Sequence, residues 1–422
     1  MLSVFYEKAL PLVFALWLIA SLPVSNFAQN KETFWHIETG YKAVDLTKVF
    51  ERECTEVLVD GNGSDRVEVR FQPNLHVKAN EVFRNLRSML SRTRQMLRPL
   101  PVNGIRFYLM QSSDRPQSYG IRLSKNDDLL LLAVIVDPAH EDRNLSDIIY
   151  KTAPHEMVHS VVHRYLRDSG TRWFEDGLAD YVGRQISDEF TSDEFSNERQ
   201  ISARATLHQS RVRQSILDWH QLRQSDLSKG KAFFQAQTQL YDASQALVGK
   251  IVADSERRGM KTPLSLLLSA LRDQVAKTGK PVDRDGLLDL IRQHLQVDVK
   301  TLGRLDKETQ QKMVESAYSM LTLPARNGDS ENKFFGTNIL ANIDEVQLPE
   351  NWLKYLLRTA LDEKAGSYIN SMAATALTRR ERQIDLKRLI EKASLEDQKL
   401  GERTTSTILK ELKRLSIDKW LK

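Results

Sequence analysis

The sequence has a single cysteine, Cys54, among its 422 residues. Without a second cysteine the chain cannot form an internal disulfide, a CxxC redox pair or a zinc site built from several thiolates. Any metal site in this chain must therefore be made of histidine and carboxylate ligands.

An excess of charge of one sign is also lacking. The 61 lysines and arginines nearly balance the 56 aspartates and glutamates, which leaves a net charge of +5, and both signs are interspersed along the chain. No basic face is indicated, so no nucleic-acid partner is predicted. Hydrophobic residues make up 41% and charged residues 28%. This composition disfavours disorder and fibres, and it is sufficient for two or three globular domains.

Residues 9–24 are an unbroken apolar run that follows a short polar start with Lys8. The small residue Ala28 stands at a position suited to cleavage, so residues 1–28 are predicted to be an export signal peptide. The run is also close to the roughly 18 residues of the shortest membrane-spanning helix, so an uncleaved anchor that tethers the chain to a membrane stays open. In either case we expect the rest of the chain to be exported, either periplasmic or secreted.

The first half of the chain mixes strand and helix patterns. Apolar residues recur every three or four positions over 79–98, which predicts an amphipathic helix. A second helix is predicted from an N-cap at 144–146 toward Leu166. Because Pro154 lies inside it, this helix either begins afresh there or is kinked. Strands are predicted at 66–71, 104–110, 119–123 and 129–136.

Past residue 200 the strand patterns stop, and the segments are helical in period and rich in charge. We find no convincing fixed-period repeat. This region is interpreted as a helical appendage with solvated charged faces, and docking of a protein partner or a long substrate stays open. The clearest helical segments are 263–275, 285–295, 349–362 and 386–415.

The main candidate for a metal-binding and catalytic motif is His-Glu-Met-Val-His at residues 155–159. Residues four apart on a helix share a face, with Cβ atoms roughly 5–6 Å apart, so the imidazoles of His155 and His159 can bind one metal ion. Glu156 can then reach a water molecule activated by the metal and act as the general base. The pattern predicts one zinc ion per chain.

A catalytic zinc needs a third protein ligand. His163 is one turn beyond His159, but at 1.5 Å per residue it lies about 12 Å along the helix axis from His155. That distance is too large for a shared zinc ion, so His163 is interpreted as a helix-surface or second-layer residue.

An acidic, helix-compatible segment at 172–181 (RWFEDGLADY) offers a better ligand. Together with HExxH it resembles the gluzincin peptidases, in which W-x-x-E-G-x-A-x-Y follows the zinc helix and the acid before glycine is the third ligand. The resemblance implies Asp176 as that ligand, although aspartate stands where the family has glutamate. Glu175 is the alternative, because adjacent helical residues point about 100° apart and only one can face the metal. Asp176 is favoured because Asp180, one turn later, can accept the second N–H of a ligand imidazole.

The segment Tyr241–Val248 resembles the Y-x-x-[GS]-x-x-x-V segment of aminopeptidase-N-like and bacterial-collagenase-like gluzincins. The resemblance to the aminopeptidase-N-like enzymes implies that Tyr241 donates a hydrogen bond to the oxyanion of the tetrahedral intermediate. A neutral phenol there stabilises developing negative charge without competing for zinc. A buried structural role for Tyr241 is the alternative.

The resemblance covers roughly residues 79–254 and implies a zincin-like catalytic domain with a small mixed sheet and active-site helices. It also implies that the apolar strand at 129–136 borders the cleft and pairs with a bound peptide by strand addition. The G-x-M-E-N stretch with which the aminopeptidase relatives hold a free N-terminus is absent from this sequence. Its absence favours an endopeptidase.

The sequence therefore predicts an α+β protein that hydrolyses peptides or proteins with zinc. A binding or scaffold protein that retains the fold without turnover is the alternative. Glu156 is present, however, and it is the residue that an inactive relative of the enzyme can most readily lose. A helical interaction protein with an incidental HExxH is a third interpretation. The predicted divisions are a signal peptide or anchor at 1–28, an N-terminal segment with short strands at 29–78, the catalytic domain at 79–255 and an all-α region at 256–422.

Overall fold

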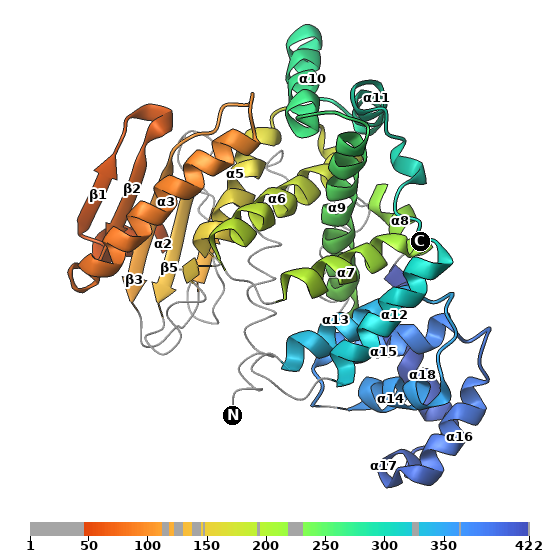
Figure 1. Cartoon of the computed structure of the whole chain (residues 1–422). Helices are drawn as coiled ribbons and strands as arrows, with labels where there is room; N and C mark the ends of the chain where they lie inside the picture. The colour runs from red at the N-terminus through yellow and green to blue at the C-terminus, as the bar shows by residue number, and fades with distance from the viewer. Residues whose placement is uncertain are drawn as a thin grey trace. The chain divides into compact units, whose positions relative to one another are not determined.

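The computed structural model (Figure 1) describes residues 46–111, 118–121, 130–136, 145–146, 148–191, 195–217, 231–322, 329–362 and 364–420. The predicted signal peptide or anchor at 1–28 lies outside the described residues. Among the helices of the described part, none is long and apolar enough to cross a membrane.

The chain divides into two compact units, each assembled from two stretches of sequence. Unit 1 comprises residues 1–193 and 251–299, and unit 2 comprises residues 194–250 and 300–422. The helix α9 (Lys231–Arg257) begins in unit 2 and ends in unit 1. The predicted division at residue 255 therefore differs from the observed units. Helical periodicity shows which face of a helix is buried, but it does not show which distant element covers that face.

Unit 1 is built on a five-stranded mixed sheet with the strand order β1-β2-β3-β5-β4. The three central strands are parallel, and an antiparallel strand lies at each edge. With the helices below, the sheet confirms the predicted α+β class. The strands are β1 (Glu56–Asp60), β2 (Val67–Phe71), β3 (Ile105–Gln111), β4 (Ser118–Ile121) and β5 (Leu130–Val136).

The four predicted strands are present, with ends that shift by one or two residues. Strand β1 was not predicted, because its side chains are largely exposed and leave no alternation of buried and exposed residues. The expectation that the strand at 129–136 offers a free edge to a peptide is wrong. β5 pairs with β3 on one side and with β4 on the other. Of these two strands it is β4 that lies at the edge of the sheet.

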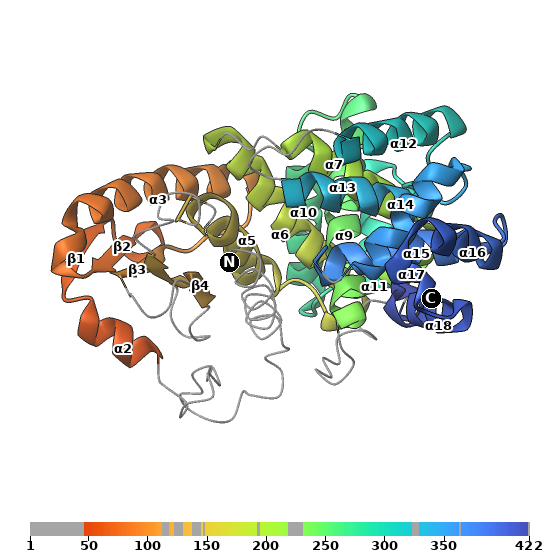
Figure 2. The same ribbon diagram turned by 90° about the horizontal axis from the view of Figure 1, so that it is seen from below.

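Helix α3 (His76–Met96) crosses one face of the sheet, and α2 (Leu46–Glu53) lies against the other face (Figure 2). On the α2 side, the rings of Phe50 and Tyr108 are 5.8 Å apart between centroids. The predicted apolar stripe of α3 is buried, and each large side chain in it contributes about 1.5–3 kcal/mol of hydrophobic stabilisation. Its buried residues are Ala79, Val82, Leu86, Met89, Leu90 and Thr93.

The remaining helices of unit 1 include the two that carry the motifs. A π-helical turn, η4 (Ile148–Thr152), leads into α5 (Ala153–Val162), and α6 (Asp168–Phe190) follows after a short loop. The predicted helices at 263–275 and 285–295 are α10 (Pro263–Thr278) and α11 (Arg284–Leu295). Short 3-10 turns of unit 1 are η2 (Gly63–Asp65) and η3 (Pro73–Leu75), and η7 (Val299–Thr301) begins in unit 1 and ends in unit 2.

Backbone hydrogen bonds tie the loop between α5 and α6 to a distant part of the sequence. The N–H of Arg167 donates to the carbonyl of Val282 (2.8 Å), and the N–H of Val282 donates to the carbonyl of Tyr165 (2.9 Å). Gly170 has a φ of +82°, and a Cβ there would lie 2.9 Å from the Cβ of Arg284, so this position requires glycine. Residues beyond the predicted domain end at 255 thus hold the loop that sets the distance between α5 and α6.

Among the residues of unit 2 that the structure describes, the regular elements are all helices. The predicted helix at 349–362 is α14 (Glu350–Leu361), but the segment at 386–415 is broken into three helices, because Asp397 and Thr404 each accept hydrogen bonds from the N–H groups of a new helix start. The other elements are α7 (Ser196–His208), α8 (Ser210–Leu217), α12 (Lys307–Thr322), α13 (Asp329–Asn342), α15 (Ser367–Arg379), α16 (Leu386–Glu396), α17 (Gln398–Gly401), α18 (Thr405–Leu415) and η8 (Ile417–Trp420).

A buried amide network joins three helices of unit 2. Gln239 on α9 donates from Nε2 to Oδ1 of Asn338 on α13 (2.8 Å), and Asn338 donates from Nδ2 to Oγ of Ser202 on α7 (2.7 Å). Asn342 donates from Nδ2 to Oε1 of Gln239 (2.8 Å). These side chains are almost completely buried, so their hydrogen bonds fix the alignment of the helices.

Candidate metal centre

The HExxH pattern lies on α5, whose first turn contains Pro154. Proline is tolerated in the first turn because its missing N–H has no partner there in any helix. The π-helical turn η4 ends directly before Ala153. Of the two arrangements that the sequence left open, the α-helix therefore begins afresh at Ala153, directly before the proline, and the two histidines lie on a regular helix.

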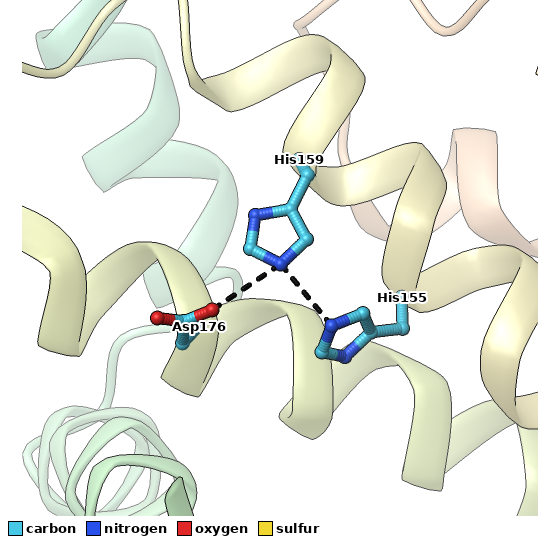
Figure 3. A group of neighbouring side chains, drawn as sticks. All are labelled: His155, His159 and Asp176. Atoms are coloured by element: carbon cyan, nitrogen blue, oxygen red, sulfur yellow. Dashed lines mark hydrogen bonds and ion pairs between the residues drawn. The ribbon is translucent and has the colours of Figure 1, made fainter. Parts of the chain in front are cut away.

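The two imidazoles of the pattern face each other (Figure 3). The Nε2 atoms of His155 and His159 are 3.1 Å apart, and His159 Nε2 lies 3.4 Å from Oδ1 of Asp176 on α6. The three ligand atoms all lie within 4.8 Å of one another. Two ligand atoms that each lie roughly 2 Å from one zinc ion at tetrahedral angles are themselves about 3.3 Å apart. The two separations of 3.1 and 3.4 Å are close to this value, so the group could hold a single metal ion.

The Nδ1 atom of each imidazole contacts a carboxylate of α6. His155 Nδ1 lies 3.0 Å from Oδ1 of Asp180, and His159 Nδ1 lies 2.9 Å from Oε1 of Glu175. An ionised carboxylate only accepts hydrogen bonds, so both Nδ1 atoms donate, and in the neutral rings both Nε2 atoms carry the lone pair that a metal needs. The predicted contact of Asp180 with a ligand imidazole is present, and Glu175 makes the equivalent contact with the second ring.

This arrangement separates the two candidates for the third ligand. The carboxylate of Asp176 lies on the Nε2 side of the histidines, with the other two ligand atoms. Glu175 lies on the Nδ1 side of His159 and also pairs with His163, whose Nδ1 is 3.4 Å away. His163 is outside the group of three and forms a second layer, as the helix geometry predicts. The role of Glu175 was missed, although its place next to Asp176 hinted at it.

The charges at the centre favour a cation. Burial lowers the pKa of His159, but its hydrogen bond with Glu175 and the nearby negative charges outweigh burial and raise the pKa to about 9. Burial raises the pKa of the Glu175 carboxyl, and the hydrogen bonds with His159 and His163 outweigh it, so the pKa is well below its usual range. The same negative field that holds a proton on an imidazole also attracts a metal ion.

The pKa of Asp180 is lowered as well. Burial raises the pKa of this carboxyl, but the hydrogen bond with His155 outweighs burial, and the positive charges of Arg184 and Lys151 add to the decrease. Asp180 is therefore ionised at neutral pH and acts only as an acceptor.

The predicted general base, Glu156, is buried on α5 with 5% of its surface exposed. Its carboxylate makes no hydrogen bond or ion pair with another residue among those that the structure describes. It is one residue after His155, so its side chain leaves the helix about 100° from that ligand. Glu156 is thus beside the candidate centre without being one of its three ligands.

The predicted oxyanion donor, Tyr241, lies on α9 in the part of that helix that belongs to unit 2. Its side chain is buried, with 5% of the surface exposed. The three candidate ligands belong to unit 1. The role of Tyr241 remains a prediction.

Gly183 lets α6 approach the segment before α5. A Cβ at this position would lie 2.6 Å from the carbonyl oxygen of Lys151 and 3.6 Å from the Cβ of His155. A backbone oxygen cannot move aside as a side chain can, so the helices would have to separate. Glycine at 183 was not singled out from the sequence, because only a packed partner shows the need for it.

We expect Gly183→Ala to destabilise the protein by about 1–3 kcal/mol, the usual cost of overpacking, and to weaken metal binding. Denaturant unfolding and metal titration measure the two effects. Gly286→Ala is the matched control in the same unit, because its Cβ would meet only side-chain atoms, at 3.1 and 3.2 Å. Equal stability of the two variants would show that the close approach of α6 at Gly183 does not require glycine for the stability of the fold.

Comparisons with models of known protein families and with curated proteins find no match to this chain. A function for the centre must therefore be argued from its own residues and their geometry.

Proposed function

We propose that this protein is a zinc-dependent peptidase of gluzincin type. The observation that carries the proposal is the convergence of His155 Nε2, His159 Nε2 and Asp176 Oδ1 within 4.8 Å of one another. Two imidazoles and one carboxylate are a ligand set of catalytic zinc sites, in which the fourth position is left for water or substrate. The carboxylates behind both rings support this function, because metal-binding histidines usually donate their other N–H to such a group.

The chemistry follows from the residues that surround the site. When bound, zinc supplies a Lewis acid that lowers the pKa of water to about 7 and polarises the scissile carbonyl. Glu156 takes the proton of the attacking water and delivers it to the leaving amine. Asp180 and Glu175 keep the two imidazoles oriented during these steps. Donation by Tyr241 to the oxyanion belongs to the proposal on the strength of the sequence resemblance alone.

The order of elements supports a zincin-like assignment for unit 1. An amphipathic helix precedes a parallel strand and a hairpin, and the hairpin precedes the HExxH helix and the helix with the acidic ligand. This order agrees with the resemblance that the sequence motifs indicate. The chain has no G-x-M-E-N stretch, so we propose cleavage within peptide or protein chains.

We further propose that the protein acts outside the cytoplasm, periplasmic or secreted. The proposal rests on the apolar run at 9–24, which is either removed as a signal peptide or kept as a membrane tether. The charged helices of residues 256–422 that belong to unit 2 are proposed to dock a protein partner.

Removal of metal tests the proposed function. We expect the purified protein to hold one zinc ion per chain, measured by elemental analysis, and to cleave an unfolded general protein substrate. Chelation is expected to reduce cleavage by at least about 100-fold, since a metal Lewis acid contributes several kcal/mol, and added zinc should restore it. Protein that holds no metal, or cleavage that chelation leaves unchanged, would contradict the proposal.

A further inference from the structure

A buried arginine lies directly behind the proposed third ligand. Arg172 is one turn before Asp176 on α6, and its Nε is 2.6 Å from Oδ2 of Asp176. Both side chains are only 3% exposed. Burial of a guanidinium is costly, so a buried arginine is retained where its partners compensate for the lost water.

The two oxygens of Asp176 have different surroundings. Oδ1 is directed at the histidines, 3.4 Å from His159 Nε2, whereas Oδ2 is directed at Arg172. A carboxylate whose second oxygen is paired with an arginine has one oxygen left for a metal. An aspartate is also one methylene shorter than glutamate, so its direction must be set more closely for Oδ1 to reach the site.

The positive charge of Arg172 also offsets part of the negative charge of the buried carboxylates near it. The buried carboxylates of Asp176, Glu175 and Asp180 lie within about one and a half turns of α6, and Glu156 adds a fourth buried acid. A guanidinium in ion contact with one of them reduces their mutual repulsion. Arginine suits this place better than lysine, because its guanidinium stays charged when buried.

We infer that Arg172 is a positioning residue for the proposed metal centre: it holds Oδ2 so that Asp176 binds the metal through Oδ1 alone. This inference rests on the proposed function. Without Arg172 the carboxylate is free to turn and to approach the metal with both oxygens or with neither. The coordination number and the affinity of the site should then change even when the fold is intact.

The test is metal binding by the full-length protein and by Arg172→Met, a variant of similar length that lacks the charge. We expect zinc affinity to fall about 10–100-fold, the usual effect of losing an outer partner of a metal ligand. Co²⁺ in place of zinc reports the coordination, because four-coordinate Co²⁺ absorbs visible light more strongly than five- or six-coordinate Co²⁺. The variant is expected to show a shifted and weaker band.

Arg92→Met is the matched control. Arg92 pairs with Glu189 near the end of the same helix, with Nε 2.7 Å from Oε2, so the variant also removes an ion pair of α6 but leaves the metal centre intact. Its zinc affinity and Co²⁺ spectrum should equal those of the wild type. A far-ultraviolet circular dichroism spectrum without metal shows whether each variant is folded.

The outcomes separate this inference from the proposed function. Wild-type protein that binds no metal would overturn both. Metal bound by the wild type and by Arg172→Met with equal affinity and the same Co²⁺ spectrum would overturn only the role of Arg172. If Arg172→Met does not fold, Arg172→Lys replaces it, because lysine keeps the charge without the planar group. We expect a smaller loss of affinity with a changed spectrum, and wild-type behaviour of Arg172→Lys would then overturn the inference.

Discussion

Glu156→Gln is expected to reduce peptide hydrolysis by roughly two to four orders of magnitude, the usual contribution of a general base. Glutamine has nearly the same shape as glutamate but cannot take a proton from water. Because Glu156 is not one of the three candidate ligands, the variant should still hold one zinc ion per chain. Hydrolysis of an unfolded protein substrate and elemental analysis of the same samples measure both quantities.

Glu189→Gln is the matched control for this prediction. Glu189 is an acid of α6 that pairs with Arg92 and takes no part in the metal centre, so its variant should hydrolyse the substrate as the wild type does. If Glu156→Gln keeps full hydrolysis, the assignment of the general base is wrong. If the wild type holds zinc but hydrolyses nothing, the alternative of a binding or scaffold protein with a zincin fold replaces the enzyme.

Asp176→Asn should lower zinc affinity by more than roughly 100-fold, beyond the 10–100-fold effect of changing an outer partner. The amide keeps the shape of the carboxylate but removes the negative charge that binds the ion, and it leaves Arg172 buried without its anion. Titration with zinc in competition with a chelator of known affinity measures the change.

Glu175→Gln is the control that the chain itself offers, because the two acids are adjacent and both are buried. Glu175 accepts a hydrogen bond from His159 Nδ1 and lies on the side of that ring away from the other candidate ligand atoms, so we expect its variant to lose only about 10–100-fold in affinity. A larger loss in Glu175→Gln than in Asp176→Asn would reverse the assignment and make Glu175 the third ligand.

The sequence alone was sufficient for the local part of the site. Two histidines four residues apart must share one face of a helix, and the spacing from Asp176 to Asp180 likewise places two acids on one face of the next helix. The same rule correctly predicts that His163 is too far along the helix from His155 to join the group of three candidate ligands. These relations depend only on the rise and turn of a single helix, so no tertiary contact is needed to derive them.

Only the tertiary structure distinguished Glu175 from Asp176, because the difference is which side of the His159 ring each carboxylate meets. The need for glycine at 183 and the hydrogen bonds of Val282 with the loop after α5 are likewise contacts across the fold. The division into units has the same origin. The period of a helix tells which face is buried, whereas the partner of that face is decided by packing between residues that can be more than a hundred positions apart.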